Sequence, residues 1–130
     1  MARECKIDLS GGEITVKLSA DNGIISGGDF SIYDFNTGAV ILSFKMHIDT
    51  TGTASHDVPL PAADLVDKVL SWQVLNCSPI ITDKSNLDIA IYQDDKFCTV
   101  NPPAHYALKN IPNCAVGQAL PVKGGLHFIK

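Results

Sequence analysis

The stretch AVILSFKMHID, residues 39–49, alternates apolar and polar side chains from Val40 onward. A period of two is typical of a β-strand with one buried face and one wetter face. The apolar face comprises Val40, Leu42, Phe44, Met46 and Ile48, and the other face Ile41, Ser43, Lys45, His47 and Asp49. The preceding stretch DFSIYDF, residues 29–35, is expected to pair with it through a hairpin at Asn36-Thr37-Gly38.

The same period recurs along the chain in CKIDLS, EITVKLS, KVLSWQVLN, LDIAIYQ, KFCTV and LHFIK. Turn-forming residues separate these stretches, among them Gly27-Gly28, Asp94-Asp95 and Gly124-Gly125. About eight short strands predict one all-β domain over residues 1–130, an antiparallel β-sandwich that is either immunoglobulin-like or jelly-roll. We expect at most one short helix, near residues 62–68, and a proline-rich segment at 101–122 that is mostly extended loop with an edge strand.

Composition argues against several classes of partner. The net charge is −4 and no cluster of Lys and Arg forms a stripe, so we expect no nucleic-acid partner. No apolar run is long enough to span a membrane, and the N-terminal residues lack the apolar region of a signal peptide, so we expect a cytoplasmic protein unless it is exported by another route. Charged residues make up only 18% of the chain, which favours a surface partly covered by a protein partner or a second subunit.

Four cysteines, Cys5, Cys77, Cys98 and Cys114, are widely spaced and form no C-x-x-C zinc pattern. Two disulfides would be compatible with the even number. Without a visible signal peptide, we favour four reduced and mostly buried thiols. The sequon at Asn76-Cys77-Ser78 matters only if the chain enters a glycosylating pathway.

Ser55, His56 and Asp57 are consecutive, and they resemble a catalytic triad only when read along the chain. In a strand, neighbouring side chains point to opposite faces, so Ser55 and Asp57 would lie on one face and His56 on the other, facing inward. A flat, wet sheet face also supplies neither a desolvated pocket nor an oxyanion hole. We therefore predict no catalytic site here.

A three-residue hairpin loop at Thr50-Thr51-Gly52 would pair His47 with Ser55 and Lys45 with Asp57. This register predicts one group on the outer face of the sheet, composed of His47, Asp49, Ser55 and Asp57 with Lys45. We interpret the group as a contact surface rather than an active site. A hydrolase around His47 and Ser55 remains the least favoured reading.

Acidic and aromatic residues near turns suggest ligand binding. Asp21, Asn22 and Asp29 lie in one turn-rich segment and Asp94-Asp95 in another, but no D-x-D-x-D-G loop is present. We interpret these residues as turn formers, and we predict no metal and no cofactor.

Trp72 shares the parity of Leu70 and Val74 and is expected in the core. Tyr92 beside Asp94-Asp95, and Tyr106 beside His105 in the proline-rich segment, are the candidate recognition residues.

These observations predict a non-enzymatic structural or protein-interaction module, with self-association into a homo-oligomer as one form of it. The alternative is a domain that binds carbohydrate or another small ligand through loop-tip aromatics and aspartates. The alternative site comprises Tyr106, His105, Tyr92, Asp94 and Asp95.

Overall fold

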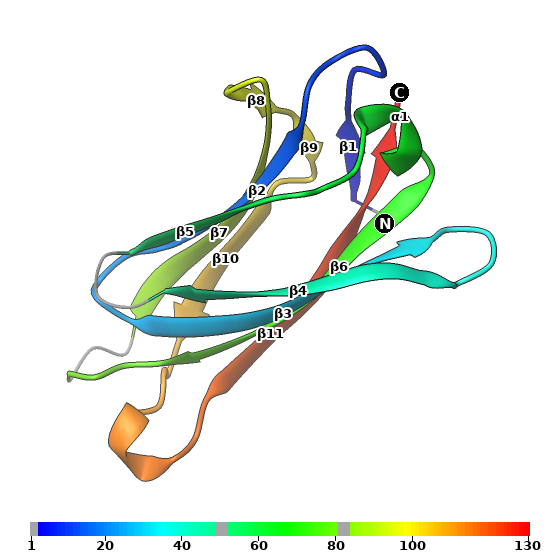
Figure 1. Ribbon diagram of the computed structural model, residues 1–130. Helices are drawn as coiled ribbons and strands as arrows, with labels where there is room; N and C mark the ends of the chain where they lie inside the picture. The colour runs from blue at the N-terminus through cyan, green and yellow to red at the C-terminus, as the bar shows by residue number, and fades with distance from the viewer. Residues whose placement is uncertain (1–2, 49–51, 81–83) are drawn as a thin grey trace.

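Two β-sheets pack face to face around a hydrophobic core in the computed structural model, which describes residues 3–48, 52–80 and 84–130 (Figure 1). Sheet A has the strand order β4-β3-β6-β11-β1-β9, and sheet B the order β10-β7-β2-β5, with β8 added to β7. All strand pairs are antiparallel in the described residues except β1 with β11, which is parallel. The predicted all-β sandwich is confirmed.

Sheet A contains β1 (Glu4–Lys6), β3 (Ile25–Asp34), β4 (Val40–Ile48), β6 (Lys68–Cys77), β9 (Val100–Asn101) and β11 (Leu120–Ile129). Sheet B contains β2 (Ile14–Ala20), β5 (Thr53–Asp57), β7 (Lys84–Gln93), β8 (Lys96–Cys98) and β10 (Ala104–Lys109). The described helices are α1 (Ala62–Leu65), at the predicted place but shorter, and a 3₁₀ turn η1 (Cys114–Val116), which was not predicted. The predicted edge strand in the proline-rich segment is β10.

The β3–β4 hairpin forms as predicted. Gly38 has φ +74°, the left-handed conformation that the loop requires, and Asp34 accepts backbone hydrogen bonds from Asn36 and Thr37. Leu42, Phe44, Met46 and Ile48 pack toward the core as the alternation indicates. Val40 does not, because the hairpin extends beyond the sandwich and leaves this side chain 64% exposed (Figure 1).

Two glycine pairs predicted as turns lie inside long strands instead. Gly27 and Gly28 are in β3, and Gly124 and Gly125 are in β11. A Cβ at Gly28 would meet the Phe30 ring at 2.7 Å, and one at Gly124 would collide with the hydroxyl of Tyr106 and meet the indole of Trp72 at 2.9 Å. Gly28 and Gly124 are therefore explained by the room that neighbouring aromatic rings need.

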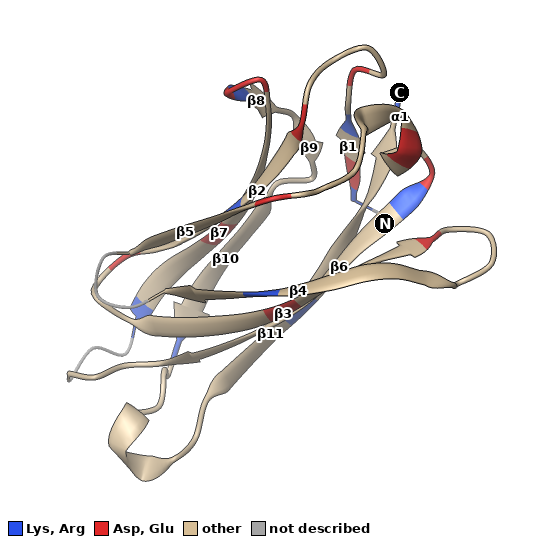
Figure 2. Ribbon diagram, viewed as in Figure 1, with Lys and Arg blue, Asp and Glu red and all other residues tan. Residues whose placement is uncertain are grey.

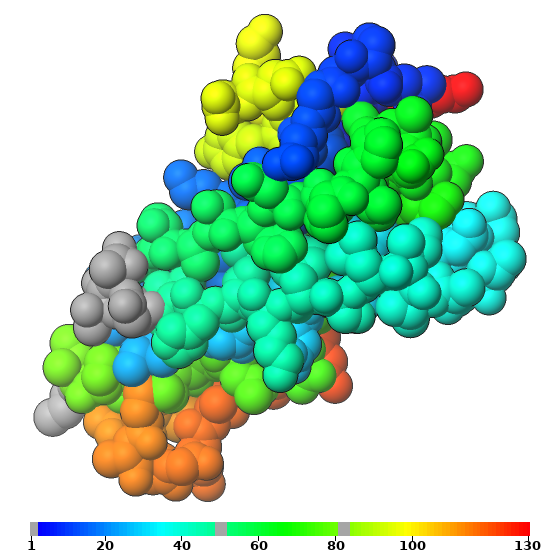
Figure 3. Space-filling view, viewed as in Figure 1, coloured from blue at the N-terminus to red at the C-terminus, as the bar shows by residue number. Residues whose placement is uncertain are grey.

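The strands β4 and β5 do not pair with each other, so the predicted hairpin between them is wrong. β4 pairs with β3 at the edge of sheet A, and β5 pairs with β2 at the edge of sheet B. The two edges lie side by side where the sandwich closes, as Figure 3 shows. Residues 49–51 of the predicted loop lie outside the described residues, whereas Gly52 has the expected positive φ of +86°.

Three stacked rings fill this side of the sandwich. Phe30 stacks on Phe44 at a centroid distance of 5.3 Å, and Phe44 stacks on His56 at 4.0 Å, with the ring planes of each pair nearly parallel. The three residues belong to β3, β4 and β5, so the stack joins the two sheets. His56 faces inward as predicted, and the exposed Ser55 and Asp57 face outward.

A second aromatic contact joins the sheets near the other edge. The indole N–H of Trp72, in β6, donates a 3.2 Å hydrogen bond to the hydroxyl of Tyr106, in β10. The guanidinium of Arg3 lies 5.6 Å from the Trp72 ring and 5.7 Å from the Tyr106 ring, and it donates to the carbonyls of Pro102 and Gly125. Trp72 is only 4% exposed, which confirms its predicted place in the core.

Replacement of Tyr106 tests this contact. We expect Tyr106→Phe to lower the free energy of unfolding by about 1 kcal/mol, because the indole N–H loses its partner. Tyr106→Ala also removes packing against the core and should cost about 3 kcal/mol. Urea unfolding at neutral pH measures both. An unchanged midpoint for Tyr106→Ala would contradict the inward placement of this ring.

Candidate functional site

The outer face of sheet B gathers polar side chains from β2, β5 and β7. Its register places Tyr92, Thr15 and Asp57 in one cross-strand row. The next row holds Ala90, Lys17 and Ser55. Because directly opposed side chains on one sheet face lie about 5 Å apart, the two rows form one continuous surface.

A depression of about 270 Å³ opens on this surface and is lined by Thr15, Lys17, Ser55, Tyr92 and Asp95. We call it the sheet-B depression. Its lining combines two hydroxyls, an ammonium, a carboxylate and an aromatic ring. Thr15 also donates a 2.7 Å hydrogen bond to the carboxylate of Asp57, which holds a second acidic group at the rim.

The ring of Tyr92 is the aromatic element of the sheet-B depression. Phe97 packs edge-on against it at a centroid distance of 5.8 Å, which restrains the orientation of the ring. The ammonium of Lys17 lies 5.8 Å from the ring centroid. Tyr92 is half-buried, so part of the ring remains accessible to a ligand.

Asp94 and Asp95 form a two-residue turn between β7 and β8 but have different roles. Both have positive φ, 52° and 61°, as a type I′ hairpin turn requires. Asp94 accepts a 2.9 Å hydrogen bond from the backbone N–H of Gly12 and so anchors the loop before β2. Asp95 lines the sheet-B depression and is the member of the pair available to a ligand.

His105 lies on the same outer face, at the edge strand β10. Its Nδ1 is 2.6 Å from the carboxylate of Asp88 in β7. Ala90 lies two residues along β7 from Asp88. Its small side chain leaves space between the His105–Asp88 pair and the sheet-B depression. Asp88 and Ala90 also border a more apolar depression of about 390 Å³ with Phe97 and Pro103. A ligand longer than one ring could therefore extend across β7.

The predicted group of His47, Asp49, Ser55 and Asp57 with Lys45 is not brought together. His47 and Lys45 lie on the outer face of sheet A, and Ser55 and Asp57 on the outer face of sheet B. Lys45 approaches Asp29 at 3.8 Å instead of Asp57, and Asp49 lies outside the described residues. The prediction failed because it paired β4 with β5. The two strands are at the edges of different sheets, so their outward side chains lie on opposite outer faces of the sandwich.

Tyr106, one of the candidate recognition residues, faces the inside of the sandwich, whereas its neighbour His105 is exposed. Thr15 and Lys17 were missed as site residues. The alternation of EITVKLS places them on an outer face, but only the pairing of β2 with both β5 and β7 shows what they lie beside.

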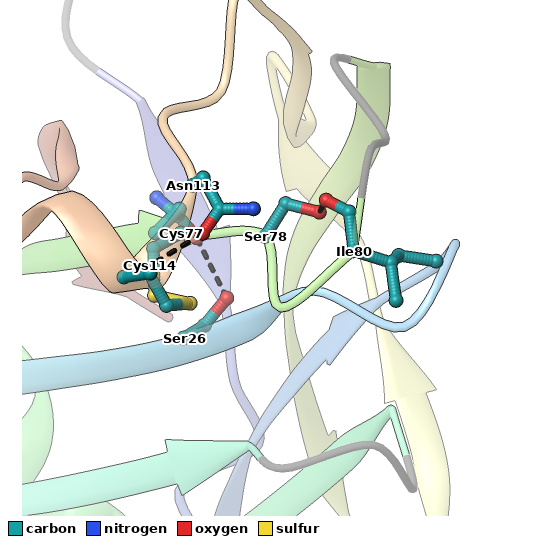
Figure 4. The surroundings of a disulfide bond; sticks show 8 residues. Ser26, Cys77, Ser78, Ile80, Asn113 and Cys114 are labelled. Atoms are coloured by element: carbon teal, nitrogen blue, oxygen red, sulfur yellow. Dashed lines mark hydrogen bonds between the residues drawn. A yellow bond between two sulfur atoms is a disulfide. The ribbon is translucent and has the colours of Figure 1, made fainter.

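Cysteine chemistry differs from the prediction of four reduced thiols. Cys77 at the end of β6 and Cys114 in η1 form a disulfide, whereas Cys5 and Cys98 are free (Figure 4). The sequon residue Asn76 is fully buried beside this bond; it accepts a 2.6 Å hydrogen bond from Ser26 and donates to the carbonyl of Leu120. In the folded protein this amide is inaccessible to a glycosylating enzyme.

The carboxylate of Asp21 stabilises the turn after β2. It accepts hydrogen bonds from the side chain and backbone N–H of Asn86 and from the hydroxyl of Ser85, which lower the pKa of Asp21. Asp29 lies elsewhere, beside Lys45. Within residues 3–48, 52–80 and 84–130, no group of three or more His, Cys, Asp or Glu side chains is placed to hold a metal ion.

No family model, no curated protein and no solved structure matches this chain. The few charged residues are scattered over both sheets (Figure 2). Among the described residues, no helix has the length and apolar character needed to cross a membrane.

The two aspartates of the β7–β8 turn provide a matched pair of variants. We expect Asp94→Gly to lower the free energy of unfolding by about 0.5–1 kcal/mol, because a solvent-exposed, charge-assisted bond to Gly12 is lost. Asp95→Gly should leave stability unchanged or raise it, since Asp-Gly is a preferred type I′ sequence. Thermal unfolding followed by circular dichroism compares them. Equal losses would contradict the separate roles assigned to the two residues.

Proposed function

We propose that this protein is a non-catalytic binding module that holds a carbohydrate on the outer face of sheet B. The observation that carries the proposal is the sheet-B depression, where the Tyr92 ring, the Lys17 ammonium and the Asp95 carboxylate converge with the hydroxyls of Thr15 and Ser55.

This lining matches the surface of a sugar ring. A pyranose has an apolar face that stacks on a flat aromatic ring and a rim of hydroxyls that both donate and accept hydrogen bonds. Asp95 accepts from such hydroxyls, Lys17 donates to them, and Ser55 does both. The depression, at about 270 Å³, has room for one ring, and its open shape lets further rings pass over Ala90 toward His105.

The non-enzymatic part of the proposal is supported by the separation of the reactive groups. His47 and Ser55, the pair around which a hydrolase was considered, lie on different sheets. His56 stacks against Phe44 between the sheets, away from the outward-facing Ser55. The sheet-B depression is open to solvent, so it lacks the water-excluded setting in which oxyanion stabilisation is strong.

Topology gives weaker support. The connections β2–β3, β4–β5, β5–β6, β6–β7 and β10–β11 each pass from one sheet to the other. We infer from these crossings that the sandwich is of the jelly-roll kind, an architecture shared by many lectin domains. Because one fold hosts many functions, carbohydrate binding is inferred from the lining of the sheet-B depression and not from this likeness of fold.

The Cys77–Cys114 disulfide supports a further part of the proposal, namely that the module works in an oxidising compartment. Structural disulfides are rare in proteins of the reducing cytosol and common in exported ones. The expected cytoplasmic location is therefore less favoured than export.

A glycan array followed by calorimetry on the best ligand tests the carbohydrate proposal. We expect Tyr92→Ala to weaken binding at least about tenfold, the equivalent of losing about 1.4 kcal/mol of stacking. Asp95→Asn should also weaken it, because the amide accepts hydroxyl hydrogen bonds less strongly than a carboxylate.

Tyr33→Ala is the matched control, since Tyr33 is a half-buried tyrosine on the outer face of sheet A. Its affinity should equal that of the wild type. Binding that survives Tyr92→Ala, or no binding to any glycan, would contradict the proposal.

Self-association is the second candidate function, and the β3–β4 hairpin favours it. Phe35, Val40 and Ile41 are 56%, 64% and 42% exposed on this hairpin, and among the described residues no strand pairs with the outer edge of β4. An exposed apolar edge strand is a template for pairing with another chain. We propose a second copy of this chain as the occupant, paired through β4.

Sedimentation velocity over a wide concentration range tests this pairing. We expect a dimer whose dissociation constant rises at least about tenfold in Ile41→Lys, since a buried charge opposes the contact. Ser43→Lys, on the same outer face of β4, should weaken it as well, and Gln73→Lys in the central strand β6 should not. A wild-type monomer at every concentration would refute the pairing.

A further inference from the structure

Two free cysteines from distant parts of the chain lie near each other at the end of the sandwich where β8 passes into β9. Cys5 lies in β1 and pairs with Val100 of β9, in sheet A. Cys98 ends β8, two residues before Val100, and pairs with Ile91 of sheet B. The chain therefore crosses from one sheet to the other between Cys98 and Val100. Cys5 belongs to the hydrophobic core, and Cys98 packs against that core.

We propose that Cys5 and Cys98 form a second disulfide of the folded protein and that Cys98 is the thiol through which an external disulfide introduces it. The bond would join β1, in sheet A, to β8, attached to sheet B. A disulfide requires Cβ atoms about 4 Å apart, a separation that the backbone sets, so the bond forms when β8 approaches β1 until the two Cβ atoms reach it.

The surroundings of the two thiols set the order of reaction. Cys98 is partly exposed and lines an open depression of about 630 Å³ together with Lys6, Phe97 and Lys130, so a small molecule can reach its sulfur. Cys5 is fully buried. Burial raises the pKa of Cys5 to about 12, and burial also raises that of Cys98. The thiolate is the attacking species, so the accessible Cys98 reacts first.

The reaction is a pair of thiol–disulfide exchanges with a small-molecule disulfide as oxidant. The Cys98 thiolate attacks one sulfur of that disulfide and expels a small thiolate, which leaves a mixed disulfide on Cys98. Cys5 then attacks Sγ of Cys98 as a thiolate, its proton passes to the second small thiolate, and that thiol departs. Two protein thiols are oxidised to one disulfide, and one small disulfide is reduced to two thiols.

Peptide mapping of the full chain tests the proposal. Reduced protein is incubated with oxidised glutathione, alkylated and digested with trypsin without reductant. Cleavage after Lys and Arg places the four cysteines on separate peptides, residues 4–6, 69–84, 97–109 and 110–123. We expect peptides 4–6 and 97–109 to be linked, alongside a link between 69–84 and 110–123. Alkylated Cys5, a lasting glutathione adduct on Cys98, or a link from Cys5 to any other cysteine would overturn the proposal.

Single variants test the order of reaction. In Cys5→Ala, Cys98 should keep glutathione as a stable mixed disulfide, because the resolving thiol is absent. In Cys98→Ser, Cys5 should remain unmodified in the folded protein. Modification of Cys5 in folded Cys98→Ser would overturn the assignment of Cys98 as the first thiol.

The melting temperature gives a second readout on wild-type protein that does not depend on the variants. Oxidation of Cys5 and Cys98 should raise it by about 5–10 °C over protein that retains only the Cys77–Cys114 bond, because a long loop of the unfolded chain is closed. No rise after the linked peptides are found would show that the bond strains the fold and would overturn its place in the native structure.

Discussion

The contact between the indole of Trp72 and the hydroxyl of Tyr106 fixes how the two sheets face each other near the β10 edge of sheet B. It joins the middle of sheet A to the edge of sheet B, and it is possible only because Gly124 presents no side chain between the rings. Arg3 then covers both rings. Since Tyr106 faces inward, alternation along β10 turns His105 outward.

The stack of Phe30, Phe44 and His56 has the same effect at the opposite side. It fixes β5 with His56 inward, so Ser55 faces outward beside Lys17. The candidate site is thus a consequence of core packing. The interior contacts at both edges decide which residues of sheet B remain on its outer face.

Alternation predicted the strands and their faces well because it is a local property of the sequence. Leu42 and Phe44 face inward, Trp72 is in the core, and Ser55 and His56 lie on opposite faces as expected. Partners could not be predicted in the same way. After β4, the chain can return in the same sheet or cross to the other sheet. The same residues of β5 face inward in both cases, so the alternation does not distinguish the two routes. The Gly124-Gly125 pair was misread for a related reason, because the rings that leave no room for a side chain at Gly124, those of Trp72 and Tyr106, belong to other strands.

The candidate site shows which features the alternation of side chains predicts and which it does not. Ser55 and Tyr92 were each predicted on an accessible surface, but in separate groups and with different neighbours. β2 lies between β5 and β7 and brings them onto one surface, with Lys17 at its centre. A binding surface built on a sheet face needs three or more strands in register, and that register is set by packing between residues far apart in the chain. The outward direction of a side chain can therefore be read from sequence, whereas the set of side chains that meet a ligand depends on the assembled sheet.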